Sequence, residues 1–125
     1  MEQHICLISI GSNTNRITNI KLAKEQLSVH FPGISFGSEQ DTIPVGMHNS
    51  AHFINQLAKA STSLSIEEVK SIFKKIEAQA GRLPEDKKNE IVKLDIDLLM
   101  YDSLVLKKSD LDRDFIIEGL KKFGL

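Results

Sequence analysis

Residues 64–82, LSIEEVKSIFKKIEAQAGR, and residues 94–98, LDIDL, are the two segments that decide the fold. Ser65 and Glu68 have the spacing of a capping box, in which each side chain accepts a hydrogen bond from the other residue's backbone N–H. Apolar residues then recur at helical spacing, and Gly81 is well suited to end the helix. LDIDL alternates apolar and acidic side chains, as in a strand with one face in a core. Together the segments predict a helix packed against a sheet.

The rest of the chain extends this pattern in both directions. Period-2 runs, helical spacing and turn residues predict further elements: a strand at 5–10, a helix at 16–31, a strand from Ile34 into Asp41, a loop at 42–50, a strand at 53–61, an exposed loop at 82–92, a short strand at 104–106 and a helix at 112–123. The order β-α-β-β-α-β predicts an α+β fold, a ferredoxin-like antiparallel sheet with helices packed on it.

Length and composition limit the classes of protein that the chain can form. A length of 125 residues fits a single domain, residues 1–125, and 41% hydrophobic residues can fill its core. The formal net charge of −1 gives no general reason to expect binding to nucleic acid or membrane. The lone Cys6 is expected in the core, and the N-terminus lacks a cationic signal region. We therefore expect a cytoplasmic monomer.

Asp95 and Asp97 are the strongest candidates for chemistry. Aspartate is disfavoured in strands, yet two stand on one face of this strand, about 6 to 7 Å apart. Two carboxylates at that spacing can share Mg²⁺ or hold a pair of ions bridged by phosphates. A bound cation would also remove the repulsion between them. On this pattern alone, a solvated strand face with two exposed acids is the alternative.

Two weaker signals lie in the first half of the chain. Gly11-Ser12-Asn13 follows a strand and precedes a helix, where backbone N–H groups can point at an anion, although a plain turn has the same pattern. It lacks the residues of a Walker A loop or a Rossmann fingerprint. Phe53 and Asn55 share a strand face, and a ring beside an amide suits a flat heterocycle. The alternative is a core phenylalanine next to a turn-capping asparagine.

A third signal lies at the end of the second helix. Arg82 could bind a phosphate there, and Glu77 could accept a hydrogen bond from a sugar hydroxyl. Surface charges at a helix end are the alternative interpretation.

The order of these motifs is more specific than any one of them. IGSN, TIPVG, FIN, IEAQAGR and LDIDLLMY, read in sequence, resemble the 6-hydroxymethyl-7,8-dihydropterin pyrophosphokinase family from about Ile5 to Leu120. The resemblance implies that the chain transfers the pyrophosphoryl group of ATP to the hydroxymethyl oxygen of the pterin in folate biosynthesis, leaving AMP.

The resemblance also implies a role for individual residues. Asp95 and Asp97 would bind two Mg²⁺ ions that bridge the ATP phosphates, and Arg82 would act with them in catalysis. The pterin would be bound by residues from three parts of the chain, namely Thr42, Val45, Phe53, Asn55 and Phe115. The nucleotide would be bound by Lys74, Glu77, Arg82 and Arg113. The expected partners are therefore ATP and 6-hydroxymethyl-dihydropterin, with neither nucleic acid nor membrane.

The chain departs from the family pattern on the nucleotide side. The loop before LDIDL usually carries arginines and a tryptophan, but here Pro84, Asn89 and Val92 occupy the matching places. The Arg/Thr and Pro-His stretch that follows the sheet in the family is also trimmed. A catalytically weakened or inactive protein that binds pterin or nucleotide on the same fold is therefore the alternative function. An unrelated ferredoxin-like interaction domain is a third possibility.

Overall fold

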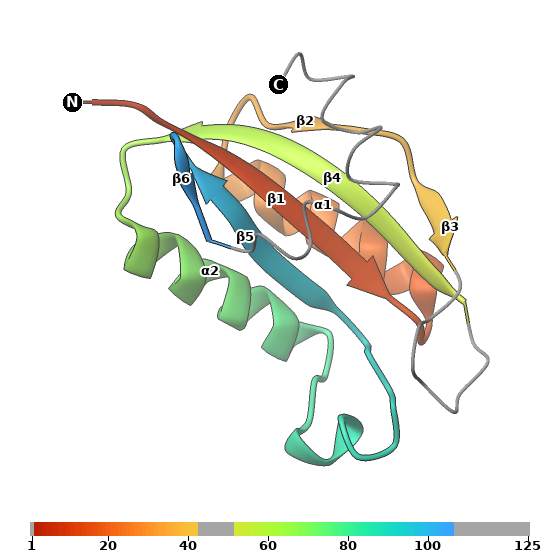
Figure 1. Cartoon of the computed structure of the whole chain (residues 1–125). Helices are drawn as coiled ribbons and strands as arrows, with labels where there is room; N and C mark the ends of the chain where they lie inside the picture. The colour runs from red at the N-terminus through yellow and green to blue at the C-terminus, as the bar shows by residue number, and fades with distance from the viewer. Residues whose placement is uncertain (1, 43–51, 107–125) are drawn as a thin grey trace.

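The computed structural model describes residues 2–42 and 52–106. Its elements, in chain order, are β1 (His4–Ser12), α1 (Arg16–His30), β2 (Ser35–Phe36), β3 (Gln40–Thr42), β4 (Phe53–Thr62), α2 (Ile66–Gln79), the short 3₁₀ turn η1 (Pro84–Asp86), β5 (Asp95–Tyr101) and β6 (Leu104–Val105) (Figure 1). The predicted helix at 112–123 lies outside the described residues.

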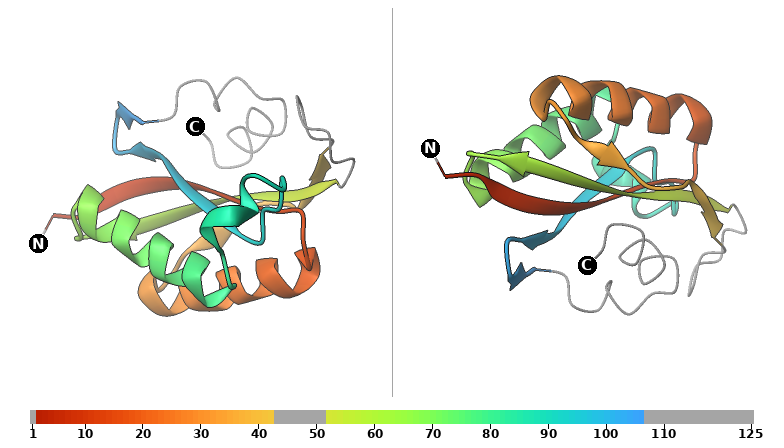
Figure 2. Two further views of the ribbon diagram at one scale, coloured as in Figure 1. Left: turned by 90° about the horizontal axis from the view of Figure 1, so that it is seen from below. Right: turned by 90° about the horizontal axis from the view of Figure 1, so that it is seen from above.

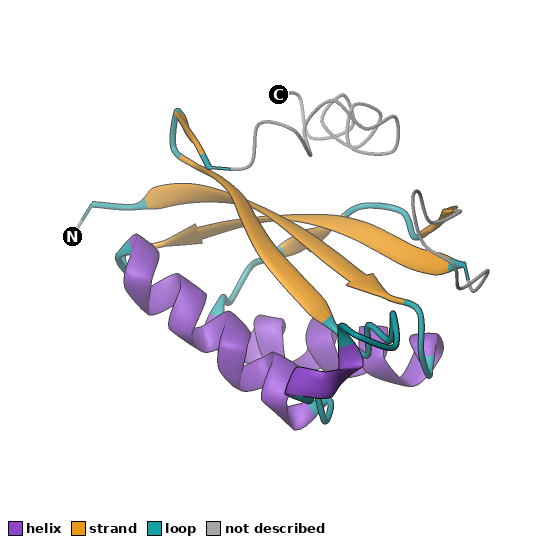
Figure 3. Ribbon diagram, turned by 60° about the horizontal axis from the view of Figure 1, so that its bottom comes forward, coloured by secondary structure: helices purple, strands orange, loops and turns teal. Residues whose placement is uncertain are grey.

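The strands form one antiparallel sheet in the order β2-β4-β1-β5-β6, with β3 paired to the same strand as β2. Figures 2 and 3 show α1 and α2 side by side on one face of this sheet. The predicted α+β fold is therefore confirmed. Because β1 lies between β4 and β5, it sets the positions of both strands that carry the candidate site residues.

The core lies between the sheet and the two helices. Alternate residues of β1, Cys6, Ile8 and Ile10, are fully buried there. The rings of Phe31 and Phe73 join the two helices, with centroids 6.2 Å apart. The predicted capping box at Ser65 and Glu68 is present, so the chain fixes the start of α2 through local hydrogen bonds. Among the described residues, neither helix has the length and apolar content of a membrane span.

The structure corrects several of the predicted segments. β5 continues past the predicted end at Leu98 to Tyr101. The prediction stopped too early because it followed the apolar–acidic alternation, which a bulge at Leu98 and Leu99 breaks. The strand expected from Ile34 into Asp41 is two short strands, β2 and β3, and Thr42 belongs to β3 rather than to the loop. The loop at 82–92 was wrongly predicted to be simply exposed, since it contains η1 and a buried Asp86.

The predicted core position of Cys6 is confirmed and has a chemical consequence. Burial, with a smaller contribution from the charge of Asp102, raises the pKa of the Cys6 thiol to about 11. The nucleophilic thiolate is therefore scarce at neutral pH. We expect Cys6 in the native protein to react with Ellman's reagent at least about a hundredfold more slowly than in urea-unfolded protein. Equal rates in the two states would contradict this packing.

Candidate active site

The candidate residues of β4 and β5 lie on the face of the sheet that the helices leave open. Asn55 of β4 pairs with Gly11 of β1, and Gly11 pairs with Asp95 of β5. Asp97 pairs with Ser9 in the next row along the same face. Two strand spacings separate Asn55 from Asp95, which places their Cα atoms about 10 Å apart. A ligand that contacts both must therefore reach across β1.

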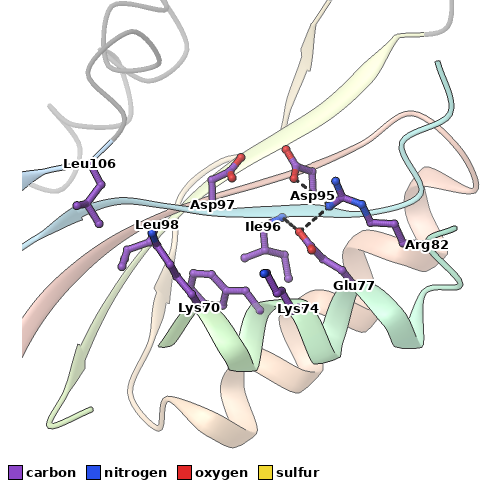
Figure 4. A pocket seen from close by; sticks show the side chains of 10 residues that line it. Lys70, Lys74, Glu77, Arg82, Asp95, Ile96, Asp97, Leu98 and Leu106 are labelled. Carbon is purple, nitrogen blue, oxygen red and sulfur yellow. Dashed lines mark hydrogen bonds and ion pairs between the residues drawn. The ribbon is translucent and has the colours of Figure 1, made fainter. Parts of the chain in front are cut away.

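Asp95 and Asp97 have the predicted arrangement. Their side chains alternate with Ile96 and Leu98, which are buried in the helix-side core. Both aspartates are only partly buried, and Figure 4 shows their carboxylates on the same side of β5. No group of three or more His, Cys, Asp or Glu side chains that could hold a metal forms within the described ranges. Two carboxylates on an open face nonetheless suit Mg²⁺, which takes its other ligands from water and phosphates.

Glu77 joins α2 to the edge of β5. Its Oε2 accepts a hydrogen bond from the backbone N–H of Ile96 at 2.8 Å and lies 2.9 Å from Nη1 of Arg82. Only 9% of Glu77 is exposed, and burial raises the pKa of its carboxyl, with the Ile96 N–H and Arg82 opposing that shift. The Glu77 side chain is therefore a buried contact between α2 and β5. It is not the surface charge of the alternative interpretation.

Arg82 connects Glu77 to Asp95, the first residue of the acidic pair. Nη1 of Arg82 lies 3.2 Å from Oδ1 of Asp95 and also donates to the carbonyl of Leu94 at 3.5 Å. These contacts use Nη1 alone, so within the described ranges Nη2 and Nε keep their donors for another acceptor. An arginine that presents two parallel N–H groups is suited to bind a phosphate.

A groove of about 390 Å³ opens between α2 and β5 beside these residues (Figure 4). Sequence analysis placed Lys74 on the nucleotide side, and its side chain lines this groove together with Glu77 and Arg82. The other lining residues are Lys70, Phe73, Asp95, Ile96, Asp97, Leu98 and Leu106.

On β4, Asn55 is held by its neighbours on the sheet. Its Nδ2 donates to Oγ1 of Thr42, so the Thr42 side chain, rather than only its backbone, contributes to this half of the site. The predicted common face of Phe53 and Asn55 is confirmed, because both flank the position where a side chain on Gly11 would lie. Val45, Arg113 and Phe115 lie outside the described residues.

The GSN segment forms neither the plain turn nor the anion-binding turn that the sequence left open. Gly11 and Ser12 belong to β1, and the backbone N–H of Asn13 donates to the carbonyl of Val92 at 2.8 Å. The Asn13 side chain donates to the carbonyl of Glu90 at 2.9 Å and accepts from the N–H of Val92 at 2.7 Å. Asn13 therefore ties the end of β1 to the segment that leads into Asp95, a role that the sequence analysis missed.

Two comparisons with known proteins identify the family of the chain. The family profile described as 7,8-dihydro-6-hydroxymethylpterin-pyrophosphokinase (HPPK) matches residues 7–124. A 2-amino-4-hydroxy-6-hydroxymethyldihydropteridine pyrophosphokinase from Aquifex aeolicus (strain VF5) is 31% identical over 101 residues, which cover 80% of this chain and 62% of that protein. The chain thus spans about three fifths of this relative's length.

The chain also has a weak similarity to a solved structure. A crystal structure of a hydantoinase/carbamoylase family amidase from Burkholderia ambifaria superposes on 98% of this chain and 33% of its own, at 10% identity and a TM-score of 0.44. That score is too low to support a conclusion.

The fold and the site thus define a class of protein, in which an antiparallel sheet carries an acidic pair beside a groove. The profile match over nearly the whole chain makes the assignment specific, and the chain belongs to the HPPK family.

The role of Asn13 can be tested by changing one atom of its amide. In Asn13→Asp an oxygen replaces the Nδ2 donor and faces the Glu90 carbonyl, leaving a buried polar contact unsatisfied. We expect the free energy of unfolding in urea to fall by about 1–3 kcal/mol and the Val92 amide to exchange hydrogen faster. Asn89→Asp is the control, since Asn89 is exposed and its side chain makes only a 3.4 Å bond, to the Glu85 carbonyl. An equal fall in the free energy of unfolding in both variants would contradict this structural role of Asn13.

Proposed function

We propose that this chain transfers the pyrophosphoryl group of ATP to the hydroxymethyl oxygen of 6-hydroxymethyl-7,8-dihydropterin. The observation that carries the proposal is the row Asn55–Gly11–Asp95, which sets an amide and an acidic pair on one open face. Family membership supports the assignment of these two halves to pterin and nucleotide. Two Mg²⁺ ions, a monomeric state and a cytoplasmic location remain predictions.

The reaction needs positioning and charge neutralisation more than a covalent group. The hydroxymethyl oxygen forms a bond to the β-phosphorus, the bond from that phosphorus to the oxygen of the α-phosphate breaks, AMP leaves and the hydroxyl proton is released. Mg²⁺, when bound, neutralises charge on the phosphate oxygens. Asp95 and Asp97 would hold it, and the Arg82 donors that bond to no described residue would bind a phosphate.

On the pterin side, the Asn55 amide would supply a donor and an acceptor to the edge of the ring. The Thr42 hydroxyl holds this amide in place, and the ring of Phe53 lies near it on the same face. Stacking by Phe53, and by Phe115 from the other side, would orient the ring so that the hydroxymethyl group points across β1 to the acidic pair.

A protein that binds pterin or nucleotide without turnover is the second candidate. It is favoured by the loop at 82–92, where Pro84, Asn89 and Val92 stand at positions that usually carry arginines or a tryptophan in the family. None of these three side chains can bind a phosphate through a charge. AMP formation that depends on the pterin separates the two candidates.

The metal role predicts the effect of removing one charge. We expect Asp97→Asn to lower pterin-dependent AMP formation about a thousandfold, because several kcal/mol of charge stabilisation would be lost. It should also abolish the rise in melting temperature that Mg²⁺ with nucleotide gives the wild type. Glu67→Gln, a charge-matched change at an exposed site on α2, should alter neither. Full activity in Asp97→Asn would refute the metal role.

Gly11 gives a separate test of the pterin side. A Cβ at this position would stand 3.0 Å from Oδ1 of Asn55 and 3.9 Å from the Phe53 ring. In Gly11→Ala the Asn55 amide must shift, so pterin affinity should fall about tenfold, whereas nucleotide affinity should change less than about twofold. Fluorescence titration with each ligand measures both. Equal losses for the two ligands would mean that Gly11 supports the sheet rather than the pterin pocket.

A further inference from the structure

The strand that holds the Asn55 amide is itself weakly held by the sheet. Thr42, whose hydroxyl accepts the hydrogen bond from Asn55, belongs to β3, which has three residues and pairs with β4 alone within the described ranges. So short an edge strand has few ladder hydrogen bonds to fix its register. A slip of one residue would turn the Thr42 side chain to the opposite face of the sheet, away from Asn55. The position of Thr42 therefore needs a further contact.

Three side chains, Arg16, Asp41 and His52, supply such a contact and are called here the Asp41 cluster. Asp41 alternates with Thr42 along β3, so its carboxylate lies on the opposite face, toward the helices. Oδ1 of Asp41 lies 2.8 Å from Nδ1 of His52, the residue that precedes β4. Oδ2 of Asp41 lies 3.4 Å from Nη1 of Arg16, the first residue of α1. The cluster thus joins β3, β4 and α1 at the end of the sheet where α1 begins (Figure 1).

Arg16 links both strands to the helix. Its Nη1 also donates to the backbone carbonyl of His52 at 3.2 Å, so one guanidinium contacts the ends of β3 and β4. The positive end of the helix dipole disfavours an arginine in the first turn, and α1 has no acidic residue there. The Asp41 carboxylate offsets this repulsion. The hydrogen bond from His52, followed by the contact with Arg16, holds the pKa of the Asp41 carboxyl below its ordinary value.

The neighbours of the Asp41 cluster in sequence belong to the pterin half of the candidate site. Thr42 follows Asp41, Phe53 follows His52, and Thr42 pairs with Phe53 across the two strands. The Asp41 side chain is 58% exposed, so its ion pairs contribute little to the stability of the whole fold. The effect of the cluster is therefore local, on the register of this one pair.

We propose that the Asp41 cluster positions the pterin half of the site. It fixes the register of Thr42 against Phe53 and, through the Thr42 hydroxyl, orients the Asn55 amide. The cluster lies on the other face of the sheet from the ring, so it acts on pterin binding only through these residues. The inference rests on the proposed function for the identity of the ligand.

Steady-state kinetics of AMP formation separate a positioning role from a loss of folded protein. In Asp41→Ala the KM for 6-hydroxymethyl-7,8-dihydropterin should rise about fivefold, the upper end of what an exposed charged contact contributes. The kcat and the KM for ATP should change less than about twofold, because the acidic pair on β5 is untouched. A loss of folded protein would instead lower the apparent kcat and leave both KM values unchanged.

Two further changes make the test specific to the hydrogen bonds of Asp41. His52→Asn keeps an N–H donor on the same branch of the side chain, so the KM for pterin should stay within about twofold of the wild-type value. His52→Ala removes that donor and should raise this KM. Glu39→Ala, the matched control, removes another exposed acid next to β3 and should alter neither KM.

Two kinetic results would overturn the proposal. An unchanged KM for pterin in Asp41→Ala would remove the cluster from pterin recognition. An equal rise in Glu39→Ala would mean that the negative charge near β3 matters rather than the contacts of Asp41.

The Asn55 side-chain amide gives a readout that does not depend on turnover. Its signals in a proton–nitrogen NMR correlation spectrum, identified by their loss in Asn55→Ala, should shift in Asp41→Ala and stay in place in Glu39→Ala. A wild-type chain that makes no AMP while Asp41→Ala shifts these signals refutes only the proposed function. Signals that stay in place in Asp41→Ala refute the inference, whatever the activity.

Discussion

One buried carboxylate, that of Glu77, holds the helix layer against the sheet where the site forms. Beside Ile96, β5 has no neighbouring strand on its outer edge within the described residues, since β6 pairs only with Met100 and Tyr101. A backbone N–H left unpaired there would be costly, and Glu77 satisfies it. The buried negative charge in turn attracts Arg82, which reaches Asp95. A single contact therefore determines how helix, strand and arginine meet.

The sheet sets the distance between the two halves of the site. β1 contributes Gly11, which leaves open the space between Asn55 and Asp95. Because strand spacing hardly varies, this separation is fixed by the fold rather than by flexible side chains. Asn13 continues the same strand and bonds to the segment before β5. β1 thus positions both halves of the candidate site, although it offers no charged group to either.

Features encoded by local pattern were predictable from sequence. The capping box at Ser65 and the common face of Asp95 and Asp97 depend on residues three and two positions apart. Features that depend on distant partners were not. The bonds of Asn13 reach residues 77 and 79 positions away, and the bulge at Leu98 and Leu99 arises from pairing with β1. Nothing in the local sequence around Glu77 indicates that it would meet the N–H of Ile96.

The distribution of charge around the groove bears on the choice between enzyme and binding protein. The carboxylates of Asp95 and Asp97 lie on β5, and the ammonium groups of Lys70 and Lys74 lie on α2. A neutral pterin would gain little from the carboxylates or from the ammonium groups. A polyanion without bound cations would be repelled by the carboxylates. A polyphosphate with bound divalent cations matches both, because its metal ions face the acids while its free oxygens face the lysines. Retention of both sets in one groove favours a metal–nucleotide complex as the ligand, which is what pyrophosphoryl transfer requires and what pterin binding alone does not.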